Sequence, residues 1–72
     1  MPQSVVVFHS VTAALQAEKR LKGEGVAVKL IPVPRQISSD CGVCLRFDRE
    51  DEPAVRRALE EERIDVQGIH PV

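Results

Sequence analysis

Short apolar segments that alternate with two helical segments constrain the fold of this chain most strongly. Residues 3–8 contain three consecutive valines, a β-branched run typical of a buried strand. Ser10 or Thr12 can cap the helix that follows, in which Val11 and Leu15 belong to the apolar positions at helical spacing. Glycines at 23 and 25 end this helix, and residues 26–31 then alternate as in a second strand.

A long irregular segment occupies residues 32–42, and its Pro32 and Pro34 are expected to prevent regular strand pairing. Compact domains seldom keep so long a loop unless it has a function. Residues 43–47 alternate again and predict a third strand, and Pro53 marks the start of a second helix that runs to about Arg63. Residues 64–72 predict a fourth strand, weakened by a glycine and a proline and therefore placed at an edge.

The order strand, helix, strand, strand, helix, strand predicts an α+β fold. It is the pattern of a ferredoxin-like, two-layer sandwich, with a four-stranded antiparallel sheet and both helices on one face. The 72 residues suffice for one domain, residues 1–72. Because so short a chain buries little apolar surface, a homodimer through the uncovered sheet face, which would carry Ala27 and Ile31, stays open.

Composition and charge exclude several classes of partner. Ten basic and 11 acidic residues give a net charge of -1, which offers no general attraction for nucleic acid or anionic lipid. No apolar run approaches the roughly 18–20 residues of a membrane span, and residues 1–10 do not look like a secretory leader. We therefore expect a cytoplasmic protein whose two cysteines, Cys41 and Cys44, are kept reduced.

The predicted topology gathers several polar residues around Cys41. His9 and Ser10 at the end of the first strand, the N-terminus of the first helix and the start of the third strand meet at one end of the sheet. His70 is expected at the other end. The helix N-terminus, His9 and Arg35 are therefore candidates to stabilise a Cys41 thiolate.

The residues that flank Cys41 add to this predicted site. Gly42 has no Cβ, so backbone N–H groups could approach a bound anion or an added sulfur atom closely. Ser38 and Ser39 offer hydroxyl donors. The negative charge of Asp40 opposes a thiolate unless its side chain turns away.

Each candidate also has a purely structural interpretation. Cys41 could be a small buried residue, although a loop rich in proline and serine favours exposure. His9 could be an exposed strand end, Ser10 only a helix cap and Arg35 a solvated loop charge. The charges of the second helix are expected to form a solvated face.

Cys44 is less favoured as a reactive group. If residues 41–44 are extended, its side chain faces away from Cys41, and about 10 Å between the two Cα atoms exceeds the roughly 4.4–6.8 Å of a disulfide. A structural Cys44 is therefore favoured over a Cys-x-x-Cys redox module, which stays an alternative beside a non-catalytic binding or oligomerisation module. Cys41, Cys44 and His9 lack a fourth metal ligand, so no metal is expected.

The segment Pro-x-Pro-Arg-x-Ile-Ser-Ser-x-Cys-Gly at residues 32–42, with residues 8–10 and the helix at 14–18, resembles a small bacterial family of selenium/sulfur carrier protein-like domains. The likeness extends over nearly the whole chain, and Cys44 does not belong to the motif. It implies that Cys41 carries sulfur or selenium, by analogy with TusA-type sulfur relay proteins, and implies a link to selenium metabolism. TusA-type carriers place their cysteine before a proline at a helix N-terminus, whereas Cys41 precedes Gly42 and a strand.

The resulting hypothesis is a carrier rather than a stand-alone enzyme, with a persulfide or selenosulfide on Cys41 and no cofactor. A donor protein such as a cysteine desulfurase would load Cys41, and an acceptor enzyme would receive the atom. Neither nucleic acid nor a membrane is expected as a partner. The residues expected to support Cys41 are His9, Ser10, Arg35, Ser38, Ser39 and Gly42.

Overall fold

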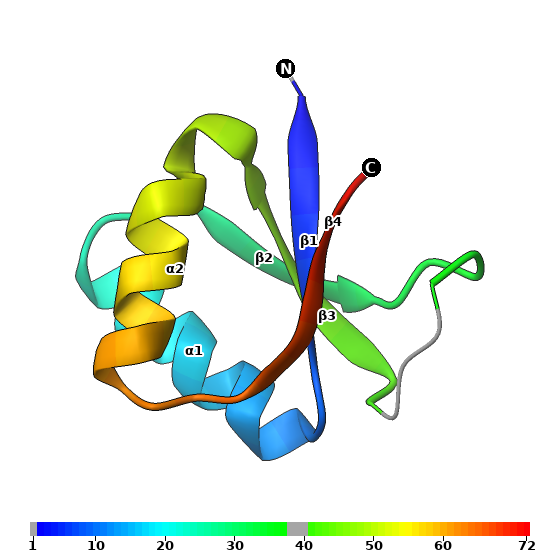
Figure 1. Cartoon of the computed structure of the whole chain (residues 1–72), viewed down its shortest axis with the longest axis horizontal. Helices are drawn as coiled ribbons and strands as arrows, with labels where there is room; N and C mark the ends of the chain where they lie inside the picture. The colour runs from blue at the N-terminus through cyan, green and yellow to red at the C-terminus, as the bar shows by residue number, and fades with distance from the viewer. Residues whose placement is uncertain (1, 38–40) are drawn as a thin grey trace.

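The computed structural model describes residues 2–37 and 41–72, which form one sheet with two helices on one of its faces (Figure 1). This arrangement confirms the predicted α+β, ferredoxin-like fold. The elements are β1 (Gln3–Phe8), α1 (Val11–Gly23), β2 (Val28–Pro32), β3 (Val43–Asp48), the short 3-10 helix η1 (Arg49–Asp51), α2 (Glu52–Glu61) and β4 (Val66–Pro71). Within the described residues, no helix is long and apolar enough to cross a membrane.

The four strands lie in the order β2-β3-β1-β4, and every neighbouring pair is antiparallel. Val7 near the end of β1 pairs with Cys44 near the start of β3. His70 on β4 pairs with Val5, closer to the start of β1. The end of β1 and the start of β3 therefore share one end of the sheet, as the topology predicts, and His70 lies away from that end.

α1 begins and ends through identifiable backbone contacts. The Ser10 hydroxyl accepts a hydrogen bond of 3.2 Å from the Ala13 N–H, which confirms Ser10 as the cap. At the other end, the Val26 N–H donates to the Leu21 carbonyl at 3.0 Å. Because Val26 still belongs to the helix terminus, β2 begins at Val28 and is shorter at its start than the alternation predicts.

The expectation that Pro32 prevents strand pairing is wrong, because Pro32 closes β2 and pairs with Val43. β2 is an edge strand, and the N–H of the next residue, Val33, donates inward to the Gly42 carbonyl at 3.2 Å. Since successive N–H groups of a strand point to opposite sides, the position without an N–H faces the outer edge of the sheet. Proline is tolerated there because no ladder hydrogen bond is lost.

α2 and β4 are both shorter than predicted. α2 carries Pro53 in its first turn, as expected, but ends at Glu61. Arg63 follows in the left-handed region with a φ of 55°, and the Ile64 N–H then donates to the Leu59 carbonyl at 2.9 Å. These residues form the helix terminus, so β4 begins only at Val66.

Two apolar clusters lie on opposite faces of the sheet. The main core is between the sheet and the helices, and its buried members are Val6, Phe8, Ala14, Ala17, Leu21, Leu45, Phe47, Val55, Ala58 and Leu59. The smaller cluster, on the face without helices, consists of Val5, Val7 and Cys44 with Ile31, Val33 and Ile37 packed against them.

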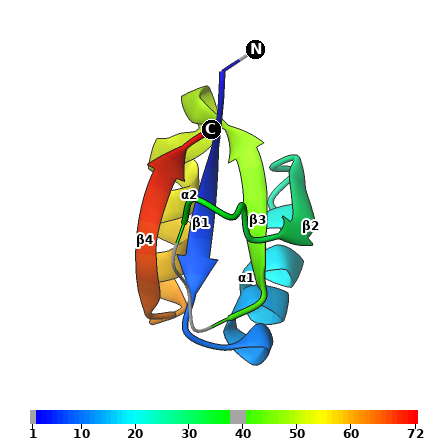
Figure 2. The ribbon, with the colours of Figure 1, turned by 90° about the vertical axis from the view of Figure 1, so that its right-hand side faces the viewer.

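The chain itself covers part of the sheet face that the helices leave free. Residues 33–37, termed the covering segment, run across this face in front of β3 and β1 (Figure 2). A turn holds the segment, with the Ile37 N–H donating to the Pro34 carbonyl at 3.0 Å. The apolar centre of this face is therefore buried within the chain. Little exposed apolar surface is left there to drive a dimer through this face.

Candidate functional site

Cys41 lies two residues before β3, and β3 starts at the end of the sheet where β1 leads into α1 (Figure 1). The side chain is only 4% exposed, and Cys41 is not part of a disulfide. β3, which begins two residues after Cys41, is an inner strand with β2 and β1 on either side. The expectation that the proline- and serine-rich loop leaves Cys41 exposed is therefore wrong.

His9 and Ser10 connect β1 to α1 at this same end, and both are exposed. β1 and β3 pair with Val7 opposite Cys44, and the same register continued beyond the ladder sets His9 opposite Gly42. Ser10 uses its hydroxyl oxygen as the acceptor of the α1 cap and keeps its own O–H as a donor. The topology thus brings the β1–α1 connection and the residues before β3 to one end of the sheet.

The other predicted site residues are placed differently. Arg35 is exposed on the covering segment, which lies across the sheet face away from the helices rather than at the start of α1 (Figure 2). Gly42 is exposed, and nothing lies within 4 Å of the position that a Cβ would take there. Ser38 and Ser39, together with Asp40, lie outside the described residues, so their expected roles stay predictions.

Cys44 occupies a closed apolar environment. Its side chain has no exposed surface, lies among Val5 and Val7 under the covering segment, and directs its Sγ to the Pro32 carbonyl at 4.0 Å. Burial raises the pKa of the Cys44 thiol above its ordinary value, and the nearby Cys41 adds to this rise. A protonated, enclosed thiol is a poor nucleophile, which favours the structural interpretation of Cys44.

Two features of the structure were not anticipated from the sequence. Val33 and Ile37 pack on the small cluster. The only sign of this packing in the sequence is that both residues are apolar within an otherwise polar segment. Val11 and Leu15 were assigned to the apolar positions of the first helix, yet they are 50% and 48% exposed. The buried side of α1 is formed by smaller residues and Leu21 instead.

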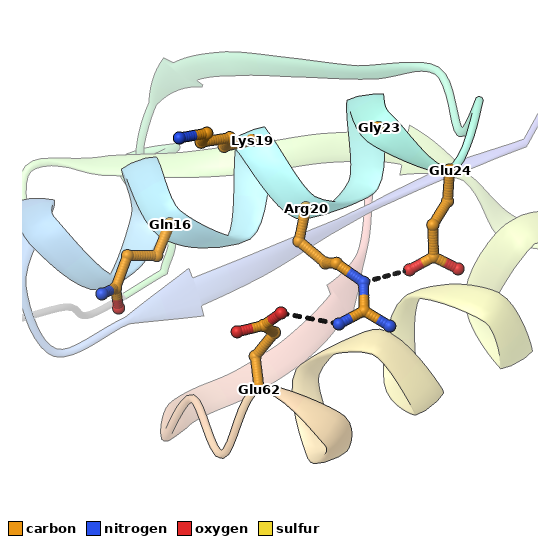
Figure 3. A pocket seen from close by; sticks show the side chains of 6 residues that line it. All are labelled: Gln16, Lys19, Arg20, Gly23, Glu24 and Glu62. Carbon is orange, nitrogen blue, oxygen red and sulfur yellow. Dashed lines mark hydrogen bonds and ion pairs between the residues drawn. The ribbon is translucent and has the colours of Figure 1, made fainter.

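A separate groove of about 530 Å³ runs between α1 and the end of α2 (Figure 3). At its centre Arg20 binds Glu24 at 2.5 Å, Glu62 at 2.6 Å, and Glu61. The hydrogen bonds to Glu24 and Glu62 raise the pKa of Arg20 further above its ordinary value. None of the predicted site residues lines the groove, and the ion pairs of Arg20 with Glu61 and Glu62 join the two helices.

The described part of the chain contains no group of three or more His, Cys, Asp or Glu side chains that could hold a metal ion. The chemistry available at the Cys41 end is therefore that of a thiol, an imidazole, a hydroxyl and backbone groups at the start of a 13-residue helix. Such a set can donate hydrogen bonds to a sulfur atom held at Cys41.

Comparisons with known proteins give one family and one relative. The model of the family described as "Putative Se/S carrier protein-like" matches residues 3–71. The Uncharacterized protein YtiA of Escherichia coli (strain K12) is 29% identical over 45 residues, which are 62% of this chain and 53% of that protein. The chain thus spans about half the length of that relative. No solved structure matches the chain.

Proposed function

The chain belongs to the Se/S carrier protein-like family, and we propose that it carries a sulfur or selenium atom on Cys41. The observation that carries this proposal is the family match, which extends over residues 3–71 and so includes the whole Cys41 region. The proposed role is that of a cytoplasmic carrier linked to selenium metabolism, loaded by one protein and emptied by another. A cysteine desulfurase is the proposed donor, and an acceptor enzyme takes the atom onward.

Loading is a thiol exchange without net oxidation. The Cys41 thiolate attacks the terminal sulfur of a donor persulfide, a new S–S bond forms at Cys41 Sγ, and the donor's S–S bond breaks. The bond's electron pair leaves with the donor sulfur as a thiolate, which takes up the proton that Cys41 released. A donor with selenium in the terminal position gives the selenosulfide in the same way, and transfer to an acceptor thiolate reverses the step.

The arrangement at this end of the sheet supports the proposal. The start of α1 places partly positive backbone N–H groups there, and His9 and Ser10 add an imidazole and a hydroxyl. A hydroxyl, an imidazole N–H and backbone N–H groups can donate hydrogen bonds to a persulfide sulfur on Cys41. Because Cys41 is only 4% exposed, loading also requires the residues around Cys41 to move aside when a donor binds.

Mass spectrometry of the intact protein tests this function. We expect the reduced wild type, incubated with glutathione persulfide or with a cysteine desulfurase and cysteine, to gain one sulfur atom, about 32 Da, that dithiothreitol removes. Cys44→Ser is the matched control and should gain the same mass, whereas Cys41→Ser should gain none. An adduct that persists in Cys41→Ser, or a wild type that neither donor loads, would contradict the proposal.

A further inference from the structure

Two cations lie directly opposite each other on the sheet face without helices. Lys29 on β2 pairs with Arg46 on β3, and residues in register share a face. Arg46 comes two positions after Cys44, which belongs to the small cluster, so both cations lie on the face of that cluster. Residues in register are about 4.5–5.5 Å apart between their Cα atoms, and like charges placed there repel each other.

The two charges are not compensated within the described part of the chain. Lys29 and Arg46 take part in no ion pair there, whereas the helix layer pairs Arg20, Lys22 and Arg56 with glutamates. Arg46 is also half-buried on an inner strand. Charged side chains are seldom withdrawn from solvent without a partner. The repulsion and the half-buried guanidinium therefore both favour an anion supplied from outside the chain.

A hollow of about 170 Å³ lies between β1, β2 and β3 at this place. The start of β1 and the end of β3, which border it, lie beyond the covering segment in Figure 2. Pockets for drug-sized ligands measure roughly 300–1,000 Å³, so this hollow suits one small group. Its lining residues, termed the cationic hollow, are Gln3, Ala27, Val28, Lys29, Arg46 and Asp48. They carry two positive charges and one negative charge.

A third cation lies beside the cationic hollow, at Gln3. The Gln3 backbone carbonyl accepts hydrogen bonds from the Val72 N–H at 3.0 Å and from the Arg49 Nε at 3.2 Å. These bonds hold the Arg49 guanidinium next to the hollow, although Arg49 does not line it. The Gln3 side chain, which does line the hollow, can add an amide donor.

We propose that the cationic hollow binds a phosphate-type oxyanion, either free or as the phosphoryl group of a small molecule. The Arg46 guanidinium can form two parallel N–H···O bonds to such a group, and the Lys29 ammonium adds a compact charge. The bound anion offsets the repulsion between the two cations. The hollow lies towards the end of the sheet away from Cys41, so this proposal does not depend on the carrier function.

Phosphate titrations followed by NMR test the site, with chloride used to hold the ionic strength constant. Inorganic phosphate should shift the amide signals around Lys29 and Arg46 of the wild type to saturation. Arg46→Gln should weaken binding about tenfold or more, and Arg46→Lys and Lys29→Gln several-fold. Arg57→Gln is the matched control, because Arg57 is an exposed arginine on α2, on the other side of the sheet. It should keep the affinity within about twofold of the wild type.

Asp48→Asn should act in the opposite direction. The substitution removes the carboxylate from the lining and should strengthen phosphate binding several-fold. The Asp48 side chain makes no capping hydrogen bond to η1, so the amide should leave this turn intact. Urea unfolding gives an independent measurement: phosphate should raise the urea midpoint of the wild type and leave that of Arg46→Gln unchanged.

Glycerol 3-phosphate separates the two sources of the oxyanion. Tighter binding of this monoester than of phosphate assigns the site to a phosphorylated small molecule, and weaker or equal binding assigns it to the free ion. A wild type whose signals do not saturate with either compound, or an equal loss of affinity in Arg57→Gln, would overturn the proposal. A polyglutamate peptide that binds where phosphate does not would also overturn it, because the cations would then serve an acidic protein surface.

Discussion

The two faces of the sheet are buried in different ways. The helix face is covered by α1 and α2, whose side chains form the main core with β1 and β3. The opposite face is covered by the five-residue covering segment, which buries Val5, Val7 and Cys44. The first kind of cover is regular and extensive, whereas the second consists of a few side chains on the segment that leads towards Cys41. We infer that the helix face determines global stability and that the opposite face controls local opening near the site.

The largest expected effect comes from the helix face. Phe8→Ala removes a fully buried ring from the main core and should lower the free energy of unfolding by about 3–5 kcal/mol. Urea unfolding followed by circular dichroism measures the loss. Val11→Ala is the control, since Val11 is half exposed and its truncation should change stability by less than about 0.5 kcal/mol. An equal loss of unfolding free energy in Phe8→Ala and Val11→Ala would contradict the assignment of Phe8 to the core and Val11 to the surface.

A substitution in the covering segment should change the free energy of unfolding less, and the accessibility of Cys44 more. Ile37→Ala removes part of a half-buried side chain and should lower the unfolding free energy by about 1 kcal/mol. In a Cys41→Ser background, where Cys44 is the only thiol, it should also raise the alkylation rate of Cys44 several-fold, because the segment that covers Cys44 opens more often.

Ile64→Ala is the matched control for this comparison, since Ile64 is a half-buried residue that packs on the main core instead. Ile64→Ala should lower the free energy of unfolding about as much as Ile37→Ala does. The alkylation rate of Cys44 in the folded protein should, however, stay closer to that of the Cys41→Ser protein without a second substitution. If both variants raise the alkylation rate equally, Cys44 becomes accessible only through global unfolding and the two faces are not independent.

The smallest effect is a pH dependence that originates in the small cluster. An unfolded cysteine loses its proton near pH 8.5, whereas burial, and then Cys41, raise the pKa of folded Cys44. The folded state thus retains a proton that the unfolded state releases. Stability from this group is complete below about pH 8.5 and is lost as the pH rises towards the folded-state pKa. Urea midpoints between about pH 7 and 10 in the Cys41→Ser background should show this decline.

Cys44→Ala in the same background provides the comparison for the pH series. The variant is expected to be less stable at neutral pH, because a buried side chain is shortened. Its stability should nevertheless fall less steeply above about pH 8.5, because the titrating thiol is gone. Parallel pH curves for the two proteins would show that burial does not perturb Cys44.

The regular part of the fold could be predicted because local signals and topology agree. Three consecutive valines specify β1, Ser10 caps α1, and a right-handed crossover leaves one place for β3. The boundaries were less accurate where tertiary contacts decide them. The Val26 N–H donates a hydrogen bond to the Leu21 carbonyl, which delays the start of β2. Pro32 belongs to an edge strand, where the missing N–H would have faced away from the sheet.

The candidate site was predictable only in its topology. The order of elements places His9, Ser10 and Cys41 at one end of the sheet, and the structure agrees on this arrangement of the chain. The burial of Cys41 follows from tertiary packing at the end of a loop, and the path of the covering segment depends on two apolar residues without periodicity. Neither property leaves a repeating pattern in the sequence.

The hydrogen bond from the Val72 N–H to the Gln3 carbonyl has a practical consequence for experiments with partner proteins. It fixes the last strand beside the first, so both ends of the described chain emerge at the end of the sheet opposite Cys41 (Figure 1). An affinity tag, a fluorophore or a fused reporter protein attached at either end would therefore leave the Cys41 end unobstructed. Immobilisation through these ends should present every molecule to a partner in the same orientation.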